Sequence, residues 1–379
     1  MTTVDILGEL ESRDLLYQVT DRAGFAKHLA DGQRKVYGGF DPTADSLTVG
    51  NLVPLLLLRR FQLAGHRPVV LVGGGTGLIG DPSGKDAERA IRDPKDVSHN
   101  VAKIREIFAK LLDFSGPNAA VVVDNAAWLC ELSYIQVLRD VGKHFSVNMM
   151  IQKDSVRERL ENREQGISYT EFSYMLLQAY DFLHLHRAHG VSAQVAGSDQ
   201  WGNTVAGIDL IRRVERAETY GMTVPLITKA DGGKFGKTEA GAVWLSAERT
   251  SPYEFYQFWL NASDPDAKRF LAVYTFLPVA EIARLSEEHD ANPAARSAQR
   301  ALAAHVTELV HGPGGLASAE AATRALFSGD VRGLTHSAVT ELFKNAPATS
   351  LSKARLVAPG APAADLLVEG GVVKSKREA

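Results

Sequence analysis

The chain has 379 residues, a formal net charge of −3, 45% hydrophobic residues and 23% charged residues. These values exclude a single small binding module and a disordered protein, and they leave ample apolar material for a core. The single cysteine, Cys130, excludes an internal disulfide, and no apolar run reaches the roughly 20 residues that span a bilayer. We therefore expect a cytoplasmic protein without membrane contact and without a global charge that attracts nucleic acid.

The first part of the chain alternates short apolar runs with amphipathic segments. The apolar runs predict strands at 35–40, 67–72, 121–124 and 191–198. The segments between and after them predict helices over about 51–64, 166–184 and 203–216. Strands and helices in alternation are typical of a doubly wound α/β sheet.

The composition changes near Ser251, where glycine-rich loops stop and Ala, Glu, Arg and Leu become dominant. This change predicts a helical domain that continues to about residue 345. The last residues predict a helix, a turn and the start of a basic helix. We expect a first domain over 1–248, a helical domain over 249–345, and a linker with a small third module over 346–379.

A polar turn at 41–48 leads into the first long helix. It contains Thr43 and Thr48, and the helix start contains Gly50. Backbone N–H groups and the positive end of the dipole at such a helix start favour an anion. A tight turn without a ligand explains the same residues.

Two glycine-rich loops carry further polar groups. GGGTGLIGDPSGKDAER at 73–89 lets the backbone approach a ligand and supplies Asp81. KADGGKFGKT at 229–238 has two lysines spaced to clamp a polyphosphate, although a solvated surface loop has the same composition. The first loop matches neither the P-loop nor the strict dinucleotide-binding pattern. The basic residues of the two loops are Lys85, Arg89, Lys234 and Lys237.

These motifs, taken in order, resemble bacterial tyrosyl-tRNA synthetases, which are class I aminoacyl-tRNA synthetases. The matching stretches are YGGFDPTADSL, LVGGGTGLIGDPSG, LRDVGKHFSVN, GISYTEFSYMLLQAYDF, GSDQWGN, KADGGKFGKT and SPYEFYQFW. The resemblance begins near residue 5 and continues to the end. It implies a Rossmann-like α/β catalytic domain with a parallel sheet, a helical anticodon-recognition domain, a C-terminal RNA-binding module and a homodimer.

The resemblance also implies a pocket for tyrosine. Tyr37 and Asp181 match the positions that hydrogen-bond the substrate phenol, and phenylalanine would leave these buried groups unpaired. The positions that match the α-ammonium site and the reacting carbonyl are Asp81, Tyr174, Gln178 and Gln200. Without the resemblance, the spacing of Tyr174, Gln178 and Asp181 indicates one helix face, which is also typical of a structural polar stripe.

Other positions match the ATP site. Asp199 is expected on the adenosine ribose, and the remaining nucleotide positions are Gly39, Asp41, Thr43, Gly50 and Gly197. The residues expected to close over pyrophosphate are Lys85, Arg89, Lys234 and Lys237. Mg²⁺ is expected to enter with ATP, and no metal site on the protein is expected.

The chain departs from the family pattern at the helix start. The His-Ile-Gly-His element is replaced by Thr48-Val49-Gly50-Asn51. Asn51 still provides an amide donor, whereas Thr48 is shorter than histidine and we expect its hydroxyl to fall short of the γ-phosphate. The C-terminal module also stops after SKREA, so we expect it to be incomplete.

The resemblance implies a tyrosine–tRNA ligase that forms tyrosyl-adenylate from tyrosine and ATP and then charges tRNA(Tyr). Two alternatives remain at this point. One is a divergent paralogue with weak activation that acts as a tyrosine sensor or an RNA-binding protein. The other is an adenylate-forming enzyme or nucleotidyltransferase with a different acceptor. Tyrosine-dependent pyrophosphate exchange, followed by charging of bulk tRNA, separates the three.

Overall fold

The chain forms two compact units, Met1–Leu316 and Ala317–Ala379. The computed structural model describes the chain except residues 1–4, 82–92, 154–155, 158–159, 161–165, 234, 239–240, 329–330, 332–335, 337–338, 341–342, 344–350, 356 and 358–359. For residues 237, 238 and 327 it describes the backbone alone. Each unit is described by itself below.

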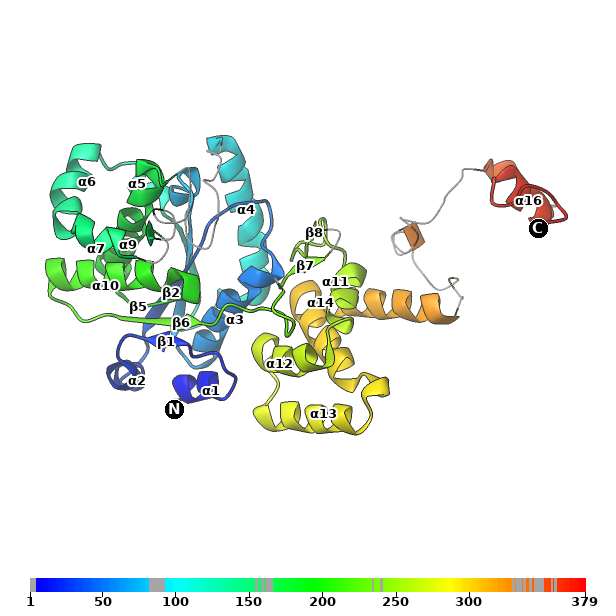
Figure 1. Cartoon of the computed structure of the whole chain (residues 1–379), viewed down its shortest axis with the longest axis horizontal. Coiled ribbons are helices and arrows are strands. Elements are labelled where there is room, and N and C mark those ends of the chain that lie inside the picture. Colours follow the sequence, from blue (N-terminus) through cyan, green and yellow to red (C-terminus); the bar gives the residue numbers. More distant parts are fainter. Residues whose placement is uncertain are drawn as a thin grey trace. The chain divides into compact units, whose positions relative to one another are not determined.

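A mixed sheet of mostly parallel strands lies at the centre of the first unit (Figure 1). Within the described residues its order is β1-β6-β5-β2-β3-β4, and every neighbouring pair is parallel except β1 with β6. The strands are β1 (Gln18–Val19), β2 (Lys35–Phe40), β3 (Arg67–Val72), β4 (Val121–Asp124), β5 (Val191–Gly197) and β6 (Tyr220–Val224). The four predicted strands are therefore confirmed, whereas β1 and β6 were not predicted.

The direction of the strand order reverses between β2 and β5. The chain moves from β2 through α3 (Val49–Leu63) to β3 on one side, and from β5 through α10 (Trp201–Glu215) to β6 on the other. Because such crossovers are right-handed, α3 and α10 cover opposite faces of the sheet. The carboxyl ends of β2 and β5 thus flank the switch point at which doubly wound sheets bind ligands.

The remaining helices surround this sheet and form the segment that follows it (Figure 1). In the first unit before residue 220 they are α1 (Ile6–Glu11), α2 (Arg22–Ala30), α4 (Pro94–Leu111), α5 (Ala126–Leu129), α6 (Tyr134–Asp140), α7 (Val147–Ile151) and α9 (Tyr169–His189). After it come α11 (Pro252–Leu260), α12 (Asp264–Tyr274), α13 (Val279–Ala291) and α14 (Ser297–Ser328). The helical character predicted from Ser251 onward is confirmed for these elements.

Helix α9 begins and ends later than the predicted range 166–184. Ser168 caps its first turn, since its side chain accepts a hydrogen bond from the N–H of Glu171 at 3.2 Å. The helix ends at Gly190, which has a φ of 66° and so adopts the left-handed conformation that terminates helices. The additional turn includes residues after 184 that have no clear apolar periodicity.

Helix α3 connects the sheet to the helical segment. Leu52, Leu55 and Phe61 are fully buried, and α3 packs against β2, β3 and α12. At its far end, the buried Arg60 donates to Glu9 Oε1 at 2.8 Å and to the carbonyl of Thr275 at 2.6 Å. Carbonyls at a helix end lack donors within the helix, so Arg60 supplies one just beyond α12. Burial lowers the pKa of Arg60 to about 10.

The helical segment has a core of aromatic rings. Trp259, Phe270 and Tyr274 pack with ring centroids 4.7 to 6.2 Å apart. Helix α14 is broken at Gly312, which has a φ of 73° and a ψ of 174° and precedes Pro313. None of the described helices is long and apolar enough to cross a membrane.

Within its described residues, the second unit contains the end of α14 and one further α-helix, α16 (Ala363–Glu369). Arg355 pairs with Glu369 at 2.9 Å, and Lys376 pairs with Asp365 at 2.5 Å. The backbone after α16 forms turns and bends over 370–378, so the predicted start of a basic helix is wrong. Two adjacent glycines, at 370 and 371, separate this stretch from α16.

Candidate active site

A cleft of about 590 Å³ lies at the switch point of the sheet. Every predicted site residue whose side chain is described lines this cleft. They are Tyr37, Gly39, Asp41, Thr43, Thr48, Gly50, Asn51, Asp81, Tyr174, Gln178, Asp181, Gly197, Asp199 and Gln200. The predicted residues Lys85, Arg89 and Lys234 lie outside the described residues, and Lys237 is described by its backbone alone.

Two buried polar groups, Tyr37 and Asp181, lie at the closed end of the cleft. Each is 1% exposed, and the Tyr37 ring packs on Phe182 with centroids 5.1 Å apart. Asp181 accepts hydrogen bonds from Asn125 Nδ2 at 2.9 Å and from Trp128 Nε1 at 2.7 Å. The Tyr37 hydroxyl has no hydrogen-bond partner among the described residues. A buried hydroxyl without a partner is costly, so this end is suited to a polar ligand group.

Burial controls the protonation of this pair. It raises the pKa of Asp181 to about 8, although the hydrogen bonds from Asn125 and Trp128 act in the opposite direction. Burial, together with the nearby Asp181 charge, raises the pKa of the Tyr37 hydroxyl well above 10. Tyr37 therefore remains a neutral donor, while Asp181 changes its charge within the neutral pH range.

A chain of hydrogen bonds connects Asp181 to Asp41, which follows β2. Asn125 Nδ2 also donates to Thr76 Oγ1 at 3.0 Å, and Thr76 Oγ1 donates to Asp41 Oδ1 at 2.9 Å. Tyr174 donates to the other oxygen of Asp41 at 3.1 Å. Asp41, which directly follows β2, is thus fixed by side chains from two separate segments. The sequence placed Tyr174 and Asp41 in different subsites, and the structure joins them.

Two glutamine side chains have unsatisfied acceptors in the cleft. Gln178 Oε1 and Gln194 Oε1 are buried and have no donor among the described residues. Gln200 is more fully engaged, because its Nε2 donates to Asp81 Oδ2 at 2.6 Å and to Asp199 Oδ2 at 3.1 Å. A ligand with N–H donors, such as an ammonium group, satisfies acceptors of this kind.

The start of α3 lines the cleft as well. Asn51 Oδ1 accepts from the N–H of Thr48 at 3.0 Å and from the Thr48 hydroxyl at 2.9 Å. The N–H of Val49 donates to the carbonyl of Val243 at 3.1 Å, which joins this helix start to the segment that follows the KFGKT loop. Within the described residues, the N–H of Gly50 and the Nδ2 of Asn51 have no acceptor. The two groups are therefore available to an anion.

The KFGKT loop is held on both sides of its central glycine. Phe235 lines the cleft, and its ring lies 4.7 Å from Phe270 and 5.5 Å from Tyr274, between centroids. Gly236 has a φ of 81°, and a Cβ there would lie 2.9 Å from Val49 Cγ2. A side chain at position 236 would therefore disturb the contact between this loop and α3.

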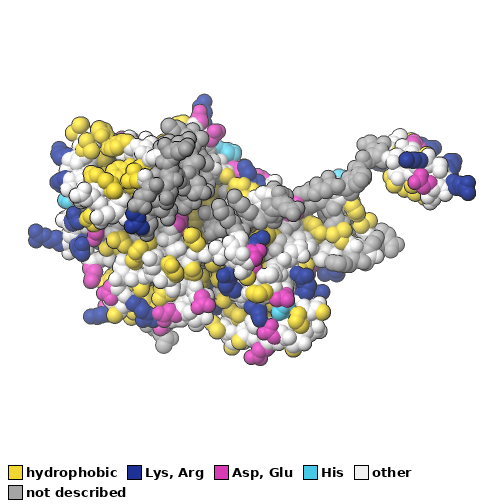
Figure 2. Space-filling view, viewed as in Figure 1, with side chains coloured by type: hydrophobic (Ala, Val, Ile, Leu, Met, Phe, Trp, Pro, Cys, Tyr) yellow, Lys and Arg dark blue, Asp and Glu magenta, His cyan; other side chains and the backbone are white. Residues whose placement is uncertain are grey.

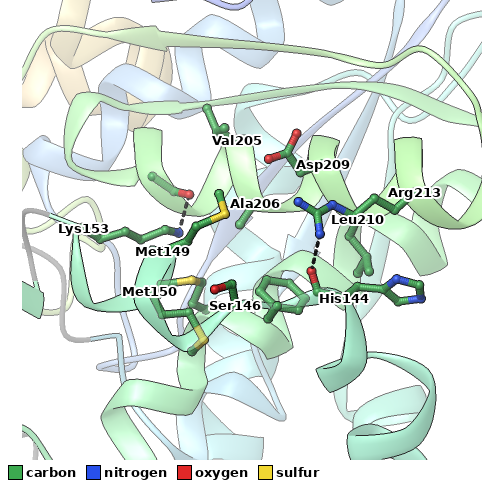
Figure 3. A pocket seen from close by; sticks show the side chains of 13 residues that line it. His144, Ser146, Met149, Met150, Lys153, Val205, Ala206, Asp209, Leu210 and Arg213 are labelled. Atoms are coloured by element: carbon green, nitrogen blue, oxygen red, sulfur yellow. Dashed lines mark hydrogen bonds between the residues drawn. The ribbon is translucent and has the colours of Figure 1, made fainter.

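A second, smaller cavity of about 80 Å³ lies between α7 and α10 (Figure 3). Lys153 Nζ donates to the carbonyl of Gly202 at 2.5 Å, and burial lowers the pKa of Lys153 to about 7. Met149, Met150 and Arg213 also surround it. In the described part of the chain, no three His, Cys, Asp or Glu residues are grouped to hold a metal ion.

Sequence reasoning missed two residues that line the cleft, Thr76 and Gln194, and two that hydrogen-bond its Asp181, Asn125 and Trp128. Asn125 and Trp128 follow the carboxyl end of β4, and a polar residue at that edge of a parallel sheet is a usable signal. Thr76 lies within the glycine-rich loop, where the glycines, Asp81 and the basic residues were considered but this hydroxyl was not. Gln194 lies inside β5 and carries no motif, so nothing in the sequence pointed to it.

The chain was compared with known proteins. The family described as "tRNA synthetases class I (W and Y)" matches residues 30–328. A tyrosine–tRNA ligase of Staphylococcus carnosus is 51% identical over 378 residues, which cover 100% of this chain and 88% of that one. A tyrosine–tRNA ligase of Yersinia pseudotuberculosis is 54% identical over 343 residues, which cover 90% and 81% respectively.

The fold is similar to a solved structure of the same kind. A C-terminally truncated mitochondrial tyrosyl-tRNA synthetase of Aspergillus nidulans superposes with a TM-score of 0.78 at 30% identity. The match covers 86% of this chain and 94% of that one. The chain therefore belongs to the class I tRNA synthetases, within their bacterial tyrosyl branch.

Proposed function

We propose that this chain is a tyrosine–tRNA ligase whose cleft binds L-tyrosine at its closed end and ATP at its open end. The observation that carries this assignment is a set of unsatisfied polar atoms: the Tyr37 hydroxyl and Gln178 Oε1 are buried without partners, and Asp181 lies beside Tyr37 in the same cleft. Tyrosine supplies what they lack, since its phenol pairs with Tyr37 and Asp181 and its ammonium group donates to Gln178. Phenylalanine would leave the first pair unsatisfied.

The reaction has two steps. The tyrosine carboxylate attacks the α-phosphorus of ATP and pyrophosphate leaves, giving tyrosyl-adenylate. A hydroxyl of the 3′-terminal ribose of tRNA(Tyr) then attacks the tyrosyl carbonyl and AMP leaves. No side chain acts as a nucleophile, so the protein contributes by positioning the reactants and stabilising developing charge.

We assign roles to the residues of the cleft on the basis of this proposal. Asp81 and Tyr174 complete the ammonium subsite with Gln178, and Gln200 lies near the reacting carbonyl. The nucleotide is bound by Gly39, Asp41, Thr43, Gly50, Asn51, Gly197 and Asp199. The described lining contains four aspartates and no lysine or arginine. Cations are therefore needed from elsewhere, and we assign them to Lys85, Arg89, Lys234, Lys237 and the Mg²⁺ that accompanies ATP.

The proposal includes a homodimer. Apolar side chains gather on the surface over α6, in the upper left of the view (Figure 2). The exposed residues of α6, α7 and the start of α9 are Tyr134, Ile135, Leu138, Val147, Met149 and Tyr169, which are 41 to 69% exposed. A monomer rarely exposes so many large apolar groups together, and a second copy of the chain accounts for them.

The remaining parts of the chain serve RNA binding in this proposal, in the cytoplasm where tRNA is charged. The helical segment recognises the anticodon, and the basic end of the second unit contributes phosphate contacts. Lys374, Lys376 and Arg377 carry its positive charge. Replacing these three residues with neutral ones should lower the affinity for tRNA and make it less dependent on salt, without changing adenylate formation.

Pyrophosphate exchange tests the assignment. We expect exchange that depends on L-tyrosine and not on phenylalanine, followed by charging of tRNA(Tyr) from bulk tRNA. Absence of exchange, with tyrosine binding retained, would instead support the tyrosine sensor considered above. Exchange without charging would support an adenylate-forming enzyme with another acceptor.

A further inference from the structure

The replacement of both family histidines at the start of α3 has a structural consequence. Asn51 Oδ1 accepts from the Thr48 N–H at 3.0 Å and from the Thr48 hydroxyl at 2.9 Å. A backbone N–H needs an oxygen acceptor, so the orientation of the Asn51 amide is fixed by chemistry. Because Oδ1 is only an acceptor, the Thr48 hydroxyl must be the donor in the second bond.

This arrangement removes Thr48 as a donor to phosphate. A threonine hydroxyl has one hydrogen, and here it is used by Asn51. Toward any other group the hydroxyl offers only lone pairs, which do not attract an anion. The bond to Asn51 is therefore a reason, in addition to its short side chain, for Thr48 not to donate to the γ-phosphate.

The same arrangement presents Asn51 as a donor. With Oδ1 held by two bonds, the Nδ2 group lies on the opposite side of the amide and has no acceptor among the described residues. The N–H of Gly50 is also without an acceptor there, and both residues line the cleft. Together they offer up to three hydrogens at the positive end of a 15-residue helix.

The geometry points to Asn51 as the side chain that donates to the ATP phosphates, and to Thr48 as the positioning residue that fixes the Asn51 amide for this role. This inference rests on the proposed function and assigns one part of it. A fixed donor loses little freedom when charge develops on the phosphates, so it contributes most in the transition state. Thr48 and Asn51 then act as one unit in place of two independent histidines.

A purely structural role is the competing explanation, because Thr-x-x-Asn at a helix start is also a capping arrangement. The substitution Asn51→Asp separates the two roles. An aspartate keeps an oxygen to accept from Thr48 and favours the helix dipole, so capping is retained. It replaces the Nδ2 donor with a negatively charged oxygen, so the hydrogen bond to the phosphate is lost and the phosphate is repelled.

The experiment compares full-length Thr48→Ser, Thr48→Val, Asn51→Ala, Asn51→Asp and the Thr48→Val/Asn51→Ala double variant. The measurements are the pre-steady-state rate of tyrosyl-adenylate formation, the affinity for tyrosine and the unfolding temperature. We expect Thr48→Ser to remain within about twofold of the parent and Asn51→Ala to lose about 10²-fold in rate. Thr48→Val should lose about tenfold, since the backbone N–H of residue 48 still holds Oδ1. Tyrosine affinity should not change in any variant.

Two results distinguish a phosphate-binding role of Asn51 from a purely structural one. Asn51→Asp should lose at least as much rate as Asn51→Ala while its unfolding temperature stays at or above that of the parent. The double variant should be no slower than Asn51→Ala alone, because Thr48 acts through Asn51. Multiplying losses in the double variant, or an Asn51→Asp enzyme as fast as the parent, would overturn the inference.

Binding of ATP in the absence of tyrosine keeps this test separate from the proposed function. Calorimetry should show weaker ATP binding for Asn51→Asp, by about tenfold, and unchanged binding for Thr48→Ser. If the parent forms no adenylate, the proposed function fails while these affinities still decide whether Asn51 contacts the phosphates. Equal ATP affinity in the parent and Asn51→Asp would reject that contact.

Discussion

The two ends of the cleft differ in the polar groups that form them and in how deeply these groups are buried. At the tyrosine end, Asp181 is buried and receives two side-chain hydrogen bonds, so its position is fixed by the core. At the nucleotide end, Thr43 and Gly50 are exposed, and the polar groups belong to the backbone and to short side chains near one helix start. Under the proposed function, specificity for tyrosine depends on a preformed rigid pocket, whereas phosphate binding depends on a surface that we expect the basic residues of two loops to complete.

This difference explains which end tolerates change. Loss of the Asp181 carboxylate would leave Trp128 Nε1 without its acceptor and would remove one of the hydrogen bonds of Asn125 in the interior. The helix start provides backbone donors that any sequence retains, so histidines there can be exchanged for Thr48 and Asn51 when the new pair holds its own geometry. The predictions below test this contrast, beginning with the largest effect.

Removal of Asp181 should abolish use of tyrosine without affecting ATP. Asp181→Ala removes a charged hydrogen-bond partner, which costs about 3 kcal/mol, or roughly 150-fold in kcat/KM for tyrosine. ATP binding should remain within about twofold. Pyrophosphate exchange measured at varied tyrosine and varied ATP separates the two. Equal losses for both substrates would show that the two ends of the cleft are not independent.

Tyrosine binding should strengthen as pH rises through about 8. The pKa of Asp181 is raised to about 8, so in the free protein the ionised form that accepts the phenol is scarce at pH 6.5 and dominant at pH 8.5. The ionised fraction grows about 25-fold between these values, which sets the expected gain in affinity. Equilibrium fluorescence titration measures it. Asp181→Asn should bind weakly at every pH and show no such slope.

The same shift has a consequence for stability. The folded protein holds a proton on Asp181 at pH values where the unfolded chain has released it. The contribution of this group to stability is therefore complete below about pH 4 and is lost as pH rises toward 8. Asp181→Asn should flatten this part of the pH profile of the unfolding free energy, measured by urea denaturation. An unchanged profile would mean that the carboxylate is ionised throughout.

Trp128 should affect tyrosine binding through Asp181. Trp128→Phe keeps an aromatic ring stacked on His184 and removes only the Nε1 donor, which lies 2.7 Å from Asp181 Oδ1. The loss of one hydrogen bond to a charged group should weaken tyrosine binding by about tenfold. It should also move the pH midpoint of binding upward, because a donor that stabilises the carboxylate is lost. A lower affinity with an unmoved midpoint would indicate a packing effect.

The sequence predicted the order of strands and helices around the cleft because their apolar periodicity is strong. It did not predict β6 (Tyr220–Val224), although all five residues are buried, since a short apolar run with a glycine resembles a loop. The ends of α9 depended on Ser168 and Gly190, whose roles are fixed by local conformation. Elements were therefore better predicted than their limits.

The resemblance predicted most of the residues that line the site. The hydrogen bonds between them became known only from the structure. A series of hydrogen bonds joins Asp41, Thr76, Asn125 and Asp181, and each bond links residues 35 to 56 positions apart in the sequence. No spacing rule reveals such contacts. The Thr48 and Asn51 pair was readable in principle, because three-residue spacing at a helix start is the capping pattern. It was overlooked because both positions were considered only as replacements for histidine.

The smallest expected effect concerns the space beside the nucleotide. A Cβ at Gly39 would meet only Leu71 Cδ2 at 3.9 Å, and the backbone there does not have a positive φ. Gly39→Ala should thus fold normally and gain slightly in stability from a less flexible unfolded chain. If ATP lies against β2, the added methyl group should raise the KM for ATP by severalfold and leave tyrosine affinity unchanged.

The neighbouring glycine provides the matched control. A Cβ at Gly38 would lie 3.2 Å from Leu58 Cδ1 and 3.4 Å from the carbonyl of Val195, and Gly38 does not line the cleft. Gly38→Ala should therefore lower the unfolding free energy by about 1 kcal/mol and leave the KM for ATP unchanged. Gly39→Ala should thus change the KM for ATP without loss of stability, whereas Gly38→Ala should lose stability without a change in that KM. An unchanged KM for ATP in Gly39→Ala would place the nucleotide away from β2, and the open end of the cleft would then need a different assignment.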